Sequence, residues 1–162
     1  MKGPNAFQRG FQRFASLRPM AWVFRHTAHH LDRATAKLTK GRTLSGMLAG
    51  IPNIMLTTTG AKSGQQRTVP LVGLNIDGNI AIVGTRFGSH EHPGWYHNLL
   101  KNPAATVEVN GTVTPVTARL VQPGAEYDRI MATADGVYTG YAKYRSRITD
   151  RHIPIFMLEA QR

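Results

Sequence analysis

The fold is decided by residues 68–85, which read TVPLVGLNIDGNIAIVGT. Two runs rich in β-branched residues, Thr68–Ile76 and Ile80–Thr85, flank the dipeptide Asp77-Gly78. Asp-Gly between such runs is a strong local signal for a two-residue hairpin turn, because both turn positions need a positive φ. The stretch therefore predicts an antiparallel β-hairpin.

A second hairpin is predicted further along the chain. Thr106–Val109 and Thr112–Leu120 are strand-like runs that flank Asn110-Gly111, another turn dipeptide of the same kind. Two further short strands are expected at Ile54–Thr58 and Ile153–Leu158.

Three segments between and after the hairpins have helical character. Pro93–Asn102 and Gly124–Ala134 read as helices, and Tyr138–Ile148 reads as a tyrosine-rich helix or loop. The order of elements is not βαβ, which argues against a Rossmann-type fold. We predict an α+β, mainly β fold: a small β-barrel with helices packed outside it.

Residues 1–50 differ in character from residues 51–162, so we expect a helical N-terminal lead-in before the barrel. Phe7, Phe11 and Phe14 recur at helical spacing among arginines, and a second helix is expected within Trp22–Leu38. The first helix is of the kind that lies on an anionic membrane surface, and equally of the kind that packs against the barrel or a second subunit.

Composition narrows the classes of function. The 162 residues fit one domain, and the absence of cysteine excludes disulfides, thiolate nucleophiles and cysteine-ligated metals. The formal net charge of +11 favours an anionic partner. The basic residues are scattered and match no nucleic-acid-binding motif, so we expect no nucleic-acid partner. The apolar run Met20–Phe24 is too short for a signal peptide or a membrane span, which favours a cytoplasmic protein.

Residues 57–67, TTTGAKSGQQR, place a glycine-bounded loop with two cations between two strands. Gly60 and Gly64 permit close approach of the backbone, and Lys62, Ser63 and Arg67 offer hydrogen-bond donors. The stretch is not a Walker motif, because no lysine-hydroxyl pair opens a helix here. It fits an anion-binding site, and it also fits an ordinary basic hairpin loop.

Residues 84–99, GTRFGSHEHPGWYHNL, lead from a strand through a glycine-containing loop into a helix near Pro93. The free N–H groups of the first helical turn are a natural site for an anion or a ring carbonyl. The spacing of His90 and His92 would let them share a metal only on a strand, and here they lie in a loop before a proline, so we predict no metal site. Trp95 and Tyr96 have the spacing of helix-packing residues.

Three long motifs resemble the deazaflavin (coenzyme F420)-dependent nitroreductase family. They are TTTGAKSGQQRTVPL, IVGTRFGSHEHPGWYHNLLKNP and YTGYAKYRSRITDRHIPIFMLE, in the family's order and separations over about residues 50–160. The resemblance implies a split β-barrel related to FMN-binding oxidases. It also implies the cofactor F420, an 8-hydroxy-5-deazaflavin with a phosphate and an oligoglutamate tail, whose negative charge accounts for part of the +11.

The resemblance also implies which residues form the site. By position, Lys62 and Arg67 resemble the cations that contact the phosphate, and Ser63 and Gln65 are neighbouring donors. The full set of implied cofactor-binding residues is Lys62, Ser63, Gln65, Arg67, Thr68, Pro70, Thr85, Arg86, Phe87, Gly88, His92, Pro93, Trp95 and Tyr96. The family commonly has Ser-Lys-Gly-Gly where this chain has Thr85-Arg86-Phe87-Gly88, so the geometry around the cofactor and the substrate range are expected to differ.

The implied reaction is hydride transfer from reduced F420 to a quinone, a nitroaromatic or an activated alkene. Tyr138, Tyr141 and Tyr144 fall where the family places its substrate-side tyrosines, and their hydroxyls can orient the acceptor or supply a proton. The alternative role for these tyrosines is packing of a lid helix. The reduced cofactor must come from a separate enzyme, because no second nucleotide site is visible.

Two other functions remain open from the sequence. One is an FMN-dependent reductase of the same barrel superfamily, and the other is a non-catalytic protein that binds a lipid or a cofactor. Split barrels of this kind often pair, so a homodimer is expected. The basic N-terminal helix would allow peripheral contact with the inner face of the cell membrane.

Overall fold

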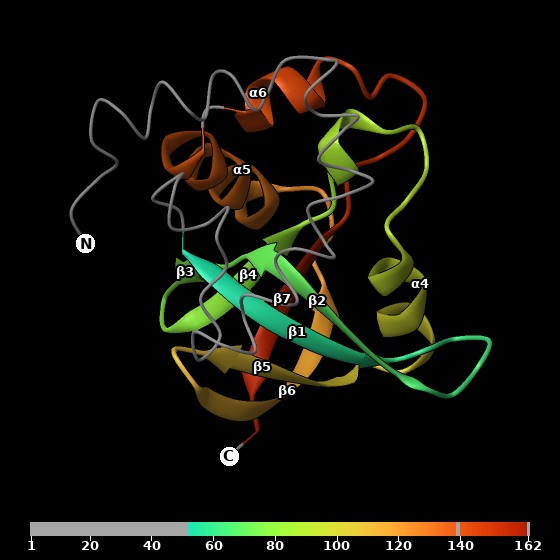
Figure 1. Cartoon of the computed structure of the whole chain (residues 1–162). Coiled ribbons are helices and arrows are strands. Elements are labelled where there is room, and N and C mark those ends of the chain that lie inside the picture. The colour runs from blue at the N-terminus through green and yellow to red at the C-terminus, as the bar shows by residue number, and fades with distance from the viewer. Residues whose placement is uncertain (1–51, 139, 162) are drawn as a thin grey trace.

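A computed structural model of the chain describes residues 52–138 and 140–161. Within them, seven antiparallel strands form one curled sheet in the order β2-β1-β5-β6-β7-β4-β3 (Figure 1). The strands are β1 (Asn53–Thr59), β2 (Gln66–Val72), β3 (Leu74–Ile76), β4 (Asn79–Val83), β5 (Ala104–Val109), β6 (Thr112–Leu120) and β7 (Ile155–Ala160). This mainly β architecture confirms the predicted barrel class.

Both predicted hairpin turns are present. Asp77 and Gly78 have φ of 50° and 86°, and Asn110 and Gly111 have φ of 51° and 85°. Positive φ at both positions is the conformation that selects Asn-Gly and Asp-Gly, because it matches the right-handed twist of the flanking strands. The turns join β3 to β4 and β5 to β6 in register.

The single strand expected over residues 68–76 is wrong, because Gly73 divides it into β2 and β3. The N–H of Gly73 donates to the Pro52 carbonyl at 2.9 Å rather than to a ladder partner. A Cβ at this position would lie 2.6 Å from Ile54 Cγ2, so only glycine allows this approach. The break lets consecutive strands lie at the two ends of the sheet order.

The helical segments are η1 (Arg86–Gly88), α4 (Gly94–Lys101), α5 (Ala125–Val137) and α6 (Gly140–Arg145). The helices predicted near residues 93 and 124 are thus confirmed. The continuous segment expected from Tyr138 to Ile148 is shorter, since α6 ends at Arg145. Tyr138 is extended, with φ −139° and ψ 111°, and ends α5.

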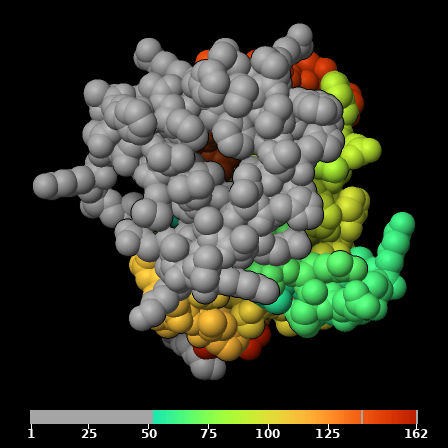
Figure 2. All heavy atoms as spheres, viewed as in Figure 1, coloured from blue at the N-terminus to red at the C-terminus, as the bar shows by residue number. Residues whose placement is uncertain are grey.

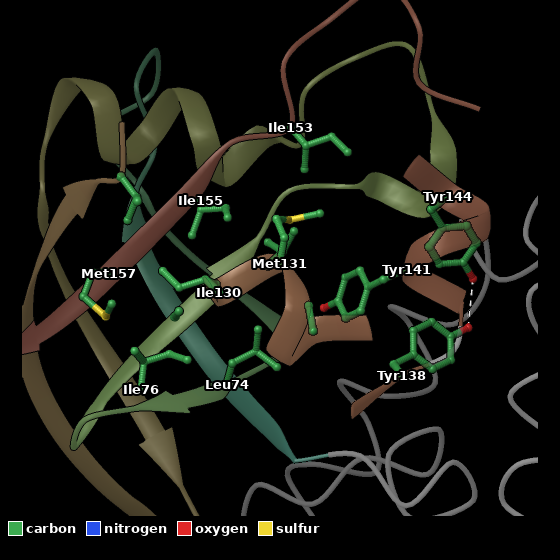
Figure 3. Packing of buried hydrophobic residues seen from close by; sticks show 14 of the residues in the cluster. Leu74, Ile76, Ile130, Met131, Tyr138, Tyr141, Tyr144, Ile153, Ile155 and Met157 are labelled. Carbon is green, nitrogen blue, oxygen red and sulfur yellow. Dashed lines mark hydrogen bonds between the residues drawn. The ribbon is translucent and has the colours of Figure 1, made fainter. Parts of the chain in front are cut away.

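The sheet is buried on both faces at β7 and β4, which explains their uninterrupted apolar runs. Ile155 and Met157 of β7 face the cluster that α5 and α6 cover (Figure 3), whereas Phe156 and Leu158 face the second cluster with α4. β4 divides in the same way, with Val83 in the first cluster and Ile82 in the second. The strand period of two therefore fixes which helices each side chain meets.

The helices expected within residues 1–50, and with them the division of the chain at residue 50, lie outside the described residues. No helix in the described part of the chain has the length and apolar character needed to cross a membrane.

Candidate functional site

The loop between β1 and β2 is a tight turn that carries cations. The N–H of Gly60 donates to the Gln65 carbonyl at 2.8 Å, and the N–H of Gly64 donates to the Gly60 carbonyl at 2.8 Å. Gly64 has φ 68°, and a Cβ on Gly60 would lie 2.7 Å from Ser63 Oγ. The glycines are therefore needed to close the turn. The loop projects from the body of the molecule (Figure 2). Lys62, Ser63 and Gln65 are exposed on it, and Arg67 is exposed at the start of β2.

The remaining residues predicted in this stretch lie on β2. Thr68 Oγ1 is 2.8 Å from Thr57 Oγ1 across the β1–β2 pair, and Pro70 lies opposite Met55. Arg67 Nη2 donates to Gln65 Oε1 at 3.2 Å. The stretch from residue 57 to residue 67 contains no carboxylate, so its field is positive.

Helix α4 fastens this loop to the rest of the site. Asn98 Oδ1 accepts from the Ala61 N–H at 2.9 Å, and Asn98 Nδ2 donates to Thr58 Oγ1 at 2.9 Å. Lys101 Nζ also donates to the Ala61 carbonyl at 2.6 Å. Sequence reasoning missed Asn98, although a polar residue between the apolar positions Trp95 and Leu99 on one helix face was a usable signal.

The loop that follows β4 has an unusual backbone. Arg86, Phe87 and Gly88 have φ of 44°, 56° and 81°, three consecutive left-handed residues. For residues with a Cβ this conformation costs about 1–2 kcal/mol each, and such strain concentrates at functional sites. Phe87 thus places an aromatic ring on a left-handed backbone, a conformation that glycine adopts without strain.

Arg86 does not present a free charge. Its Nη1 pairs with Glu91 and also donates to the His92 carbonyl at 3.1 Å. Thr85, before it, is a buried polar residue, 5% exposed. The predicted residues Thr85 and Arg86 thus help to shape the loop, and direct contact with a cofactor stays a prediction.

Arg151 lies in the segment that precedes β7, and its side chain binds the loop that follows β4. Sequence reasoning missed this residue. Its Nη2 donates to the carbonyls of Gly84, Thr85 and Ser89 at 3.1, 3.2 and 3.0 Å, and its Nε donates to Ser89 at 3.1 Å. Its Nη1 lies 3.4 Å from His92 Nδ1. An arginine two residues before a buried, apolar run was the only local signal.

His92 and the start of α4 form an aromatic stack. The His92 ring stacks on Tyr96 at 4.2 Å between centroids, with 19° between the planes. Burial and the neighbouring positive charge of Arg151 lower the pKa of His92, with smaller contributions from His97 and His152. Pro93 is buried and directly precedes α4. Trp95 is 6% exposed and packs edge-on against Phe156. Trp95 therefore lies in the core, and its predicted cofactor contact stays untested.

The three predicted tyrosines gather beneath η1. Tyr138, Tyr141 and Tyr144 are 8%, 4% and 2% exposed. The hydroxyls of Tyr138 and Tyr144 are 2.9 Å apart (Figure 3), and Tyr141 meets the Tyr138 ring edge-on at 5.6 Å. Burial raises the pKa of all three phenols, so they stay protonated at neutral pH.

The structure brings η1 and the tyrosines into direct contact. Phe87, 40% exposed, meets the Tyr144 ring edge-on at 5.9 Å. The guanidinium of Arg147 lies 5.7 Å from the centroid of the same ring. Gly88 has φ 81°, and a Cβ on it would lie 3.0 Å from Arg147 Cδ, so glycine fits this position. Helix α4, which holds the cationic β1–β2 loop through Asn98, follows η1 along the chain. The described residues hold no group of three metal-ligating side chains.

Comparison with known proteins identifies the family. The family model of the F420H(2)-dependent quinone reductases matches residues 25–160. The chain belongs to this family. Membership confirms the resemblance drawn from the motifs, the oxidoreductase class and the dependence on F420, and it favours F420 over FMN.

Similar proteins agree with this assignment. An F420H(2)-dependent quinone reductase of Mycobacterium tuberculosis is 35% identical over 142 residues, which are 85% of this chain and 95% of that protein. The solved structure of the F420-H2 dependent reductase FDR-A is 40% identical with a TM-score of 0.61, covering 67% of this chain and 94% of that one. A solved domain-swapped dimer is 34% identical with a TM-score of 0.63, covering 87% and 99%.

More distant structures share only the fold. The haem storage protein HutZ from Vibrio cholerae has a TM-score of 0.52 at 12% identity, covering 82% of this chain and 91% of that one. It supports the split-barrel class alone.

The residues of the site fit F420 by their donor chemistry. The exposed loop at residues 60–65 offers the donors of Lys62 and Ser63, and Arg67 adds a guanidinium at the start of β2. The stretch has no carboxylate, which suits a phosphate and an anionic tail. At η1, the exposed Phe87 ring, which contacts Tyr144, offers an aromatic surface of the kind that ring ligands need.

Proposed function

We propose that this protein transfers a hydride from reduced F420 to a quinone, using the η1 loop, the β1–β2 loop and the tyrosine pair as one site. The observation that carries the proposal is the contact of η1 with the Tyr138–Tyr144 pair, in a chain that belongs to the F420H(2)-dependent quinone reductases. When bound, F420 supplies the hydride, and the chain binds, orients and excludes water.

On the cofactor side, Lys62 and Arg67 hold the phosphate, with Ser63 and Gln65 as further donors. Thr68 and Pro70 continue this surface along β2. Support comes from the exposure of the loop cations and from the two hydrogen bonds of Asn98 that fix the loop. Thr85, Arg86, Phe87, Gly88, His92, Pro93, Trp95 and Tyr96 shape the side that holds the deazaflavin ring.

On the acceptor side, the two hydroxyls of Tyr138 and Tyr144 share one hydrogen between them. The second hydroxyl hydrogen is then free to donate to the acceptor oxygen. Because the phenol pKa values are raised, this donor stays protonated. Hydride addition to a quinone leaves an oxyanion that needs one proton, and a hydrogen-bonded phenol is suited to stabilise it.

The direct test is oxidation of reduced F420 by the purified full chain. A menaquinone analogue, a nitroaromatic and an activated alkene serve as acceptors, with FMN in parallel as an alternative cofactor. We expect turnover with the quinone and tight F420 binding that weakens in the double variant Lys62→Ala and Arg67→Ala. Binding of FMN in preference to F420 would refute the proposal.

The proposal extends to the partners and the location of the protein. The similar domain-swapped dimer supports a homodimer for this chain. A separate enzyme must supply reduced F420. We place the protein in the cytoplasm, with residues 1–50 as a lead-in that contacts the inner face of the membrane where quinones are found. Liposome flotation of the chain with and without residues 1–45 tests the membrane contact, because unchanged binding would contradict it.

A further inference from the structure

Arg151 makes an unusual set of contacts for a basic side chain near the surface. Its donors reach three backbone carbonyls of one irregular loop, those of Gly84, Thr85 and Ser89, and none of these acceptors is a carboxylate. A guanidinium presents five N–H donors in a fixed plane, so it can hold several carbonyls at once, which an ammonium group cannot do with the same geometry.

The loop needs such a support. Residues 86–88 are all left-handed, and two of them carry a Cβ. Within the strained turn, the backbone bonds are Gly88 N–H to Thr85 at 2.9 Å and Ser89 N–H to Arg86 at 3.1 Å, and the Arg86 side chain adds a bond to the His92 carbonyl at 3.1 Å. Strained backbone persists only when the surroundings fix it. Arg151 binds the carbonyls before and after the strained residues, so it bridges them.

The same side chain fixes the state of His92. A guanidinium only donates, so in the 3.4 Å contact with Arg151 Nη1 the nitrogen His92 Nδ1 is the acceptor; the same Nη1 also donates to the His152 carbonyl at 3.3 Å. The proton of the neutral ring is then on Nε2. The charge of Arg151 also disfavours a second proton on the ring, in agreement with the lowered pKa of His92.

We propose that Arg151 is a positioning residue for the cofactor side of the site: it holds the loop from Gly84 to Ser89 in its left-handed shape and fixes His92 as the Nε2–H tautomer. The inference rests on the proposed function for its link to F420. Its structural part concerns the free protein, and that part can be tested without the cofactor.

The test compares Arg151→Met and Arg151→Lys with the wild-type full chain. Arg119→Met is the matched control. Arg119 also donates hydrogen bonds within the protein, to Glu126 and Glu159, and it contacts neither the loop nor His92. Three readouts are needed: amide hydrogen exchange of residues 84–92, the imidazole ¹⁵N spectrum of His92 (assigned with His92→Gln), and the Kd for oxidised F420.

In the wild type and in Arg119→Met we expect a protected loop and one His92 tautomer, protonated on Nε2. In Arg151→Met the loop amides should exchange faster, the His92 signals should move towards a mixture of tautomers, and F420 should bind roughly 10- to 100-fold more weakly, as for loss of a charged hydrogen-bond donor. Arg151→Lys should lie between the two, because it keeps the charge and loses the planar fork.

Wild-type exchange and a wild-type His92 spectrum in Arg151→Met would overturn the proposal. If Arg151→Met does not fold, Arg151→Lys replaces it in the test. Wild-type values of all three readouts in Arg151→Lys would then overturn the proposal. Failure of the wild-type chain to bind F420 would instead refute the proposed function, and the two readouts on the free protein would still judge the role of Arg151.

Discussion

At the scale of single residues, the Tyr138–Tyr144 hydroxyl pair is the chemically most distinctive feature of the site. We predict that Tyr144→Phe lowers kcat with the quinone by roughly 100-fold, the order of one general-acid contribution. The Kd for F420 should change little, because the cationic loop that holds the phosphate is untouched. Steady-state kinetics and a fluorescence titration measure the two quantities.

The matched control for that variant is Tyr127→Phe. The hydroxyl of Tyr127 also donates a hydrogen bond, to the Ile153 carbonyl at 3.0 Å, and the variant removes it. Tyr127 is not part of the Tyr138–Tyr144 pair. Equal losses of kcat in the two variants would mean that the hydroxyls of the pair only stabilise the fold.

Gly140 positions the ring of Tyr138. A Cβ at Gly140 would lie 2.3, 2.4 and 2.7 Å from Cε1, Cζ and the hydroxyl oxygen of Tyr138. Gly140→Ala must therefore displace this ring and break its bond to Tyr144, and we expect a lower Tm together with a loss of kcat like that of Tyr144→Phe. Gly136→Ala is the control, since no atom lies within 4 Å of its added Cβ and alanine favours the helix by about 0.5–1 kcal/mol. A similar loss of kcat in both variants would contradict the positioning role.

At the scale of elements, α4 decides whether the cationic loop is rigid. Asn98 bonds the Ala61 N–H and Thr58 Oγ1, and Lys101 adds a bond to the Ala61 carbonyl. We predict that Asn98→Ala lowers the free energy of unfolding by about 1–3 kcal/mol, because a part-buried donor and acceptor lose their partner. F420 should bind roughly tenfold more weakly. Chemical denaturation and titration measure both effects.

The control for Asn98→Ala is Asn75→Ala, in the β3–β4 hairpin. Asn75 Oδ1 accepts from the Gly78 N–H at 3.2 Å, so a comparable side-chain bond is lost away from the site. Its F420 affinity should equal that of the wild type, and a tenfold loss in this variant too would mean that affinity simply follows stability.

The comparison of sequence with structure is also clearest at this scale. The two hairpins were predictable because Asp77-Gly78 and Asn110-Gly111 encode their turns locally. The run of left-handed residues was not, since arginine and phenylalanine carry no preference for positive φ. The contacts of Arg151 were not predictable either, because its bond to Thr85 joins residues 66 apart in the sequence and exists only after the sheet forms. Local chemistry thus predicts elements, whereas the support of the site depends on tertiary packing.

At the scale of the whole molecule, stability should fall below neutral pH. The pKa of His92 is lowered in the folded state by burial and by Arg151, His97 and His152. In the unfolded chain His92 has an ordinary histidine pKa of about 6.5. Below that pH it therefore binds a proton in the unfolded chain more readily than in the folded chain. This contribution to stability is complete above that pH and is lost as the pH falls below it.

The measurement is Tm between pH 7.5 and pH 5.5 for the wild type and for His92→Gln. We expect the wild type to lose more Tm than the variant over this window. The Asp150 carboxylate, whose pKa is lowered by its hydrogen bond with His90, titrates at lower pH and does not contribute there. Equal losses would show that His92 is not the group responsible.

The net charge of +11 over the whole chain should govern how F420 is captured. The cofactor of this family carries a phosphate and an oligoglutamate tail, so a positive protein attracts it over the screening length, about 10 Å at 0.1 M salt and about 3 Å at 1 M. We predict that the Kd for F420 rises roughly tenfold between low and high salt, chiefly through a slower association rate. The riboside of the same deazaflavin, which lacks the phosphate and the tail, should bind with almost no salt dependence. In the double variant Lys62→Ala and Arg67→Ala, the salt dependence of the Kd for F420 should become smaller but remain, because most of the charge lies elsewhere in the chain.

Identical salt dependence for F420 and the riboside would mean that the charge serves another partner. The lipid surface proposed for residues 1–50 would then be the first alternative to test.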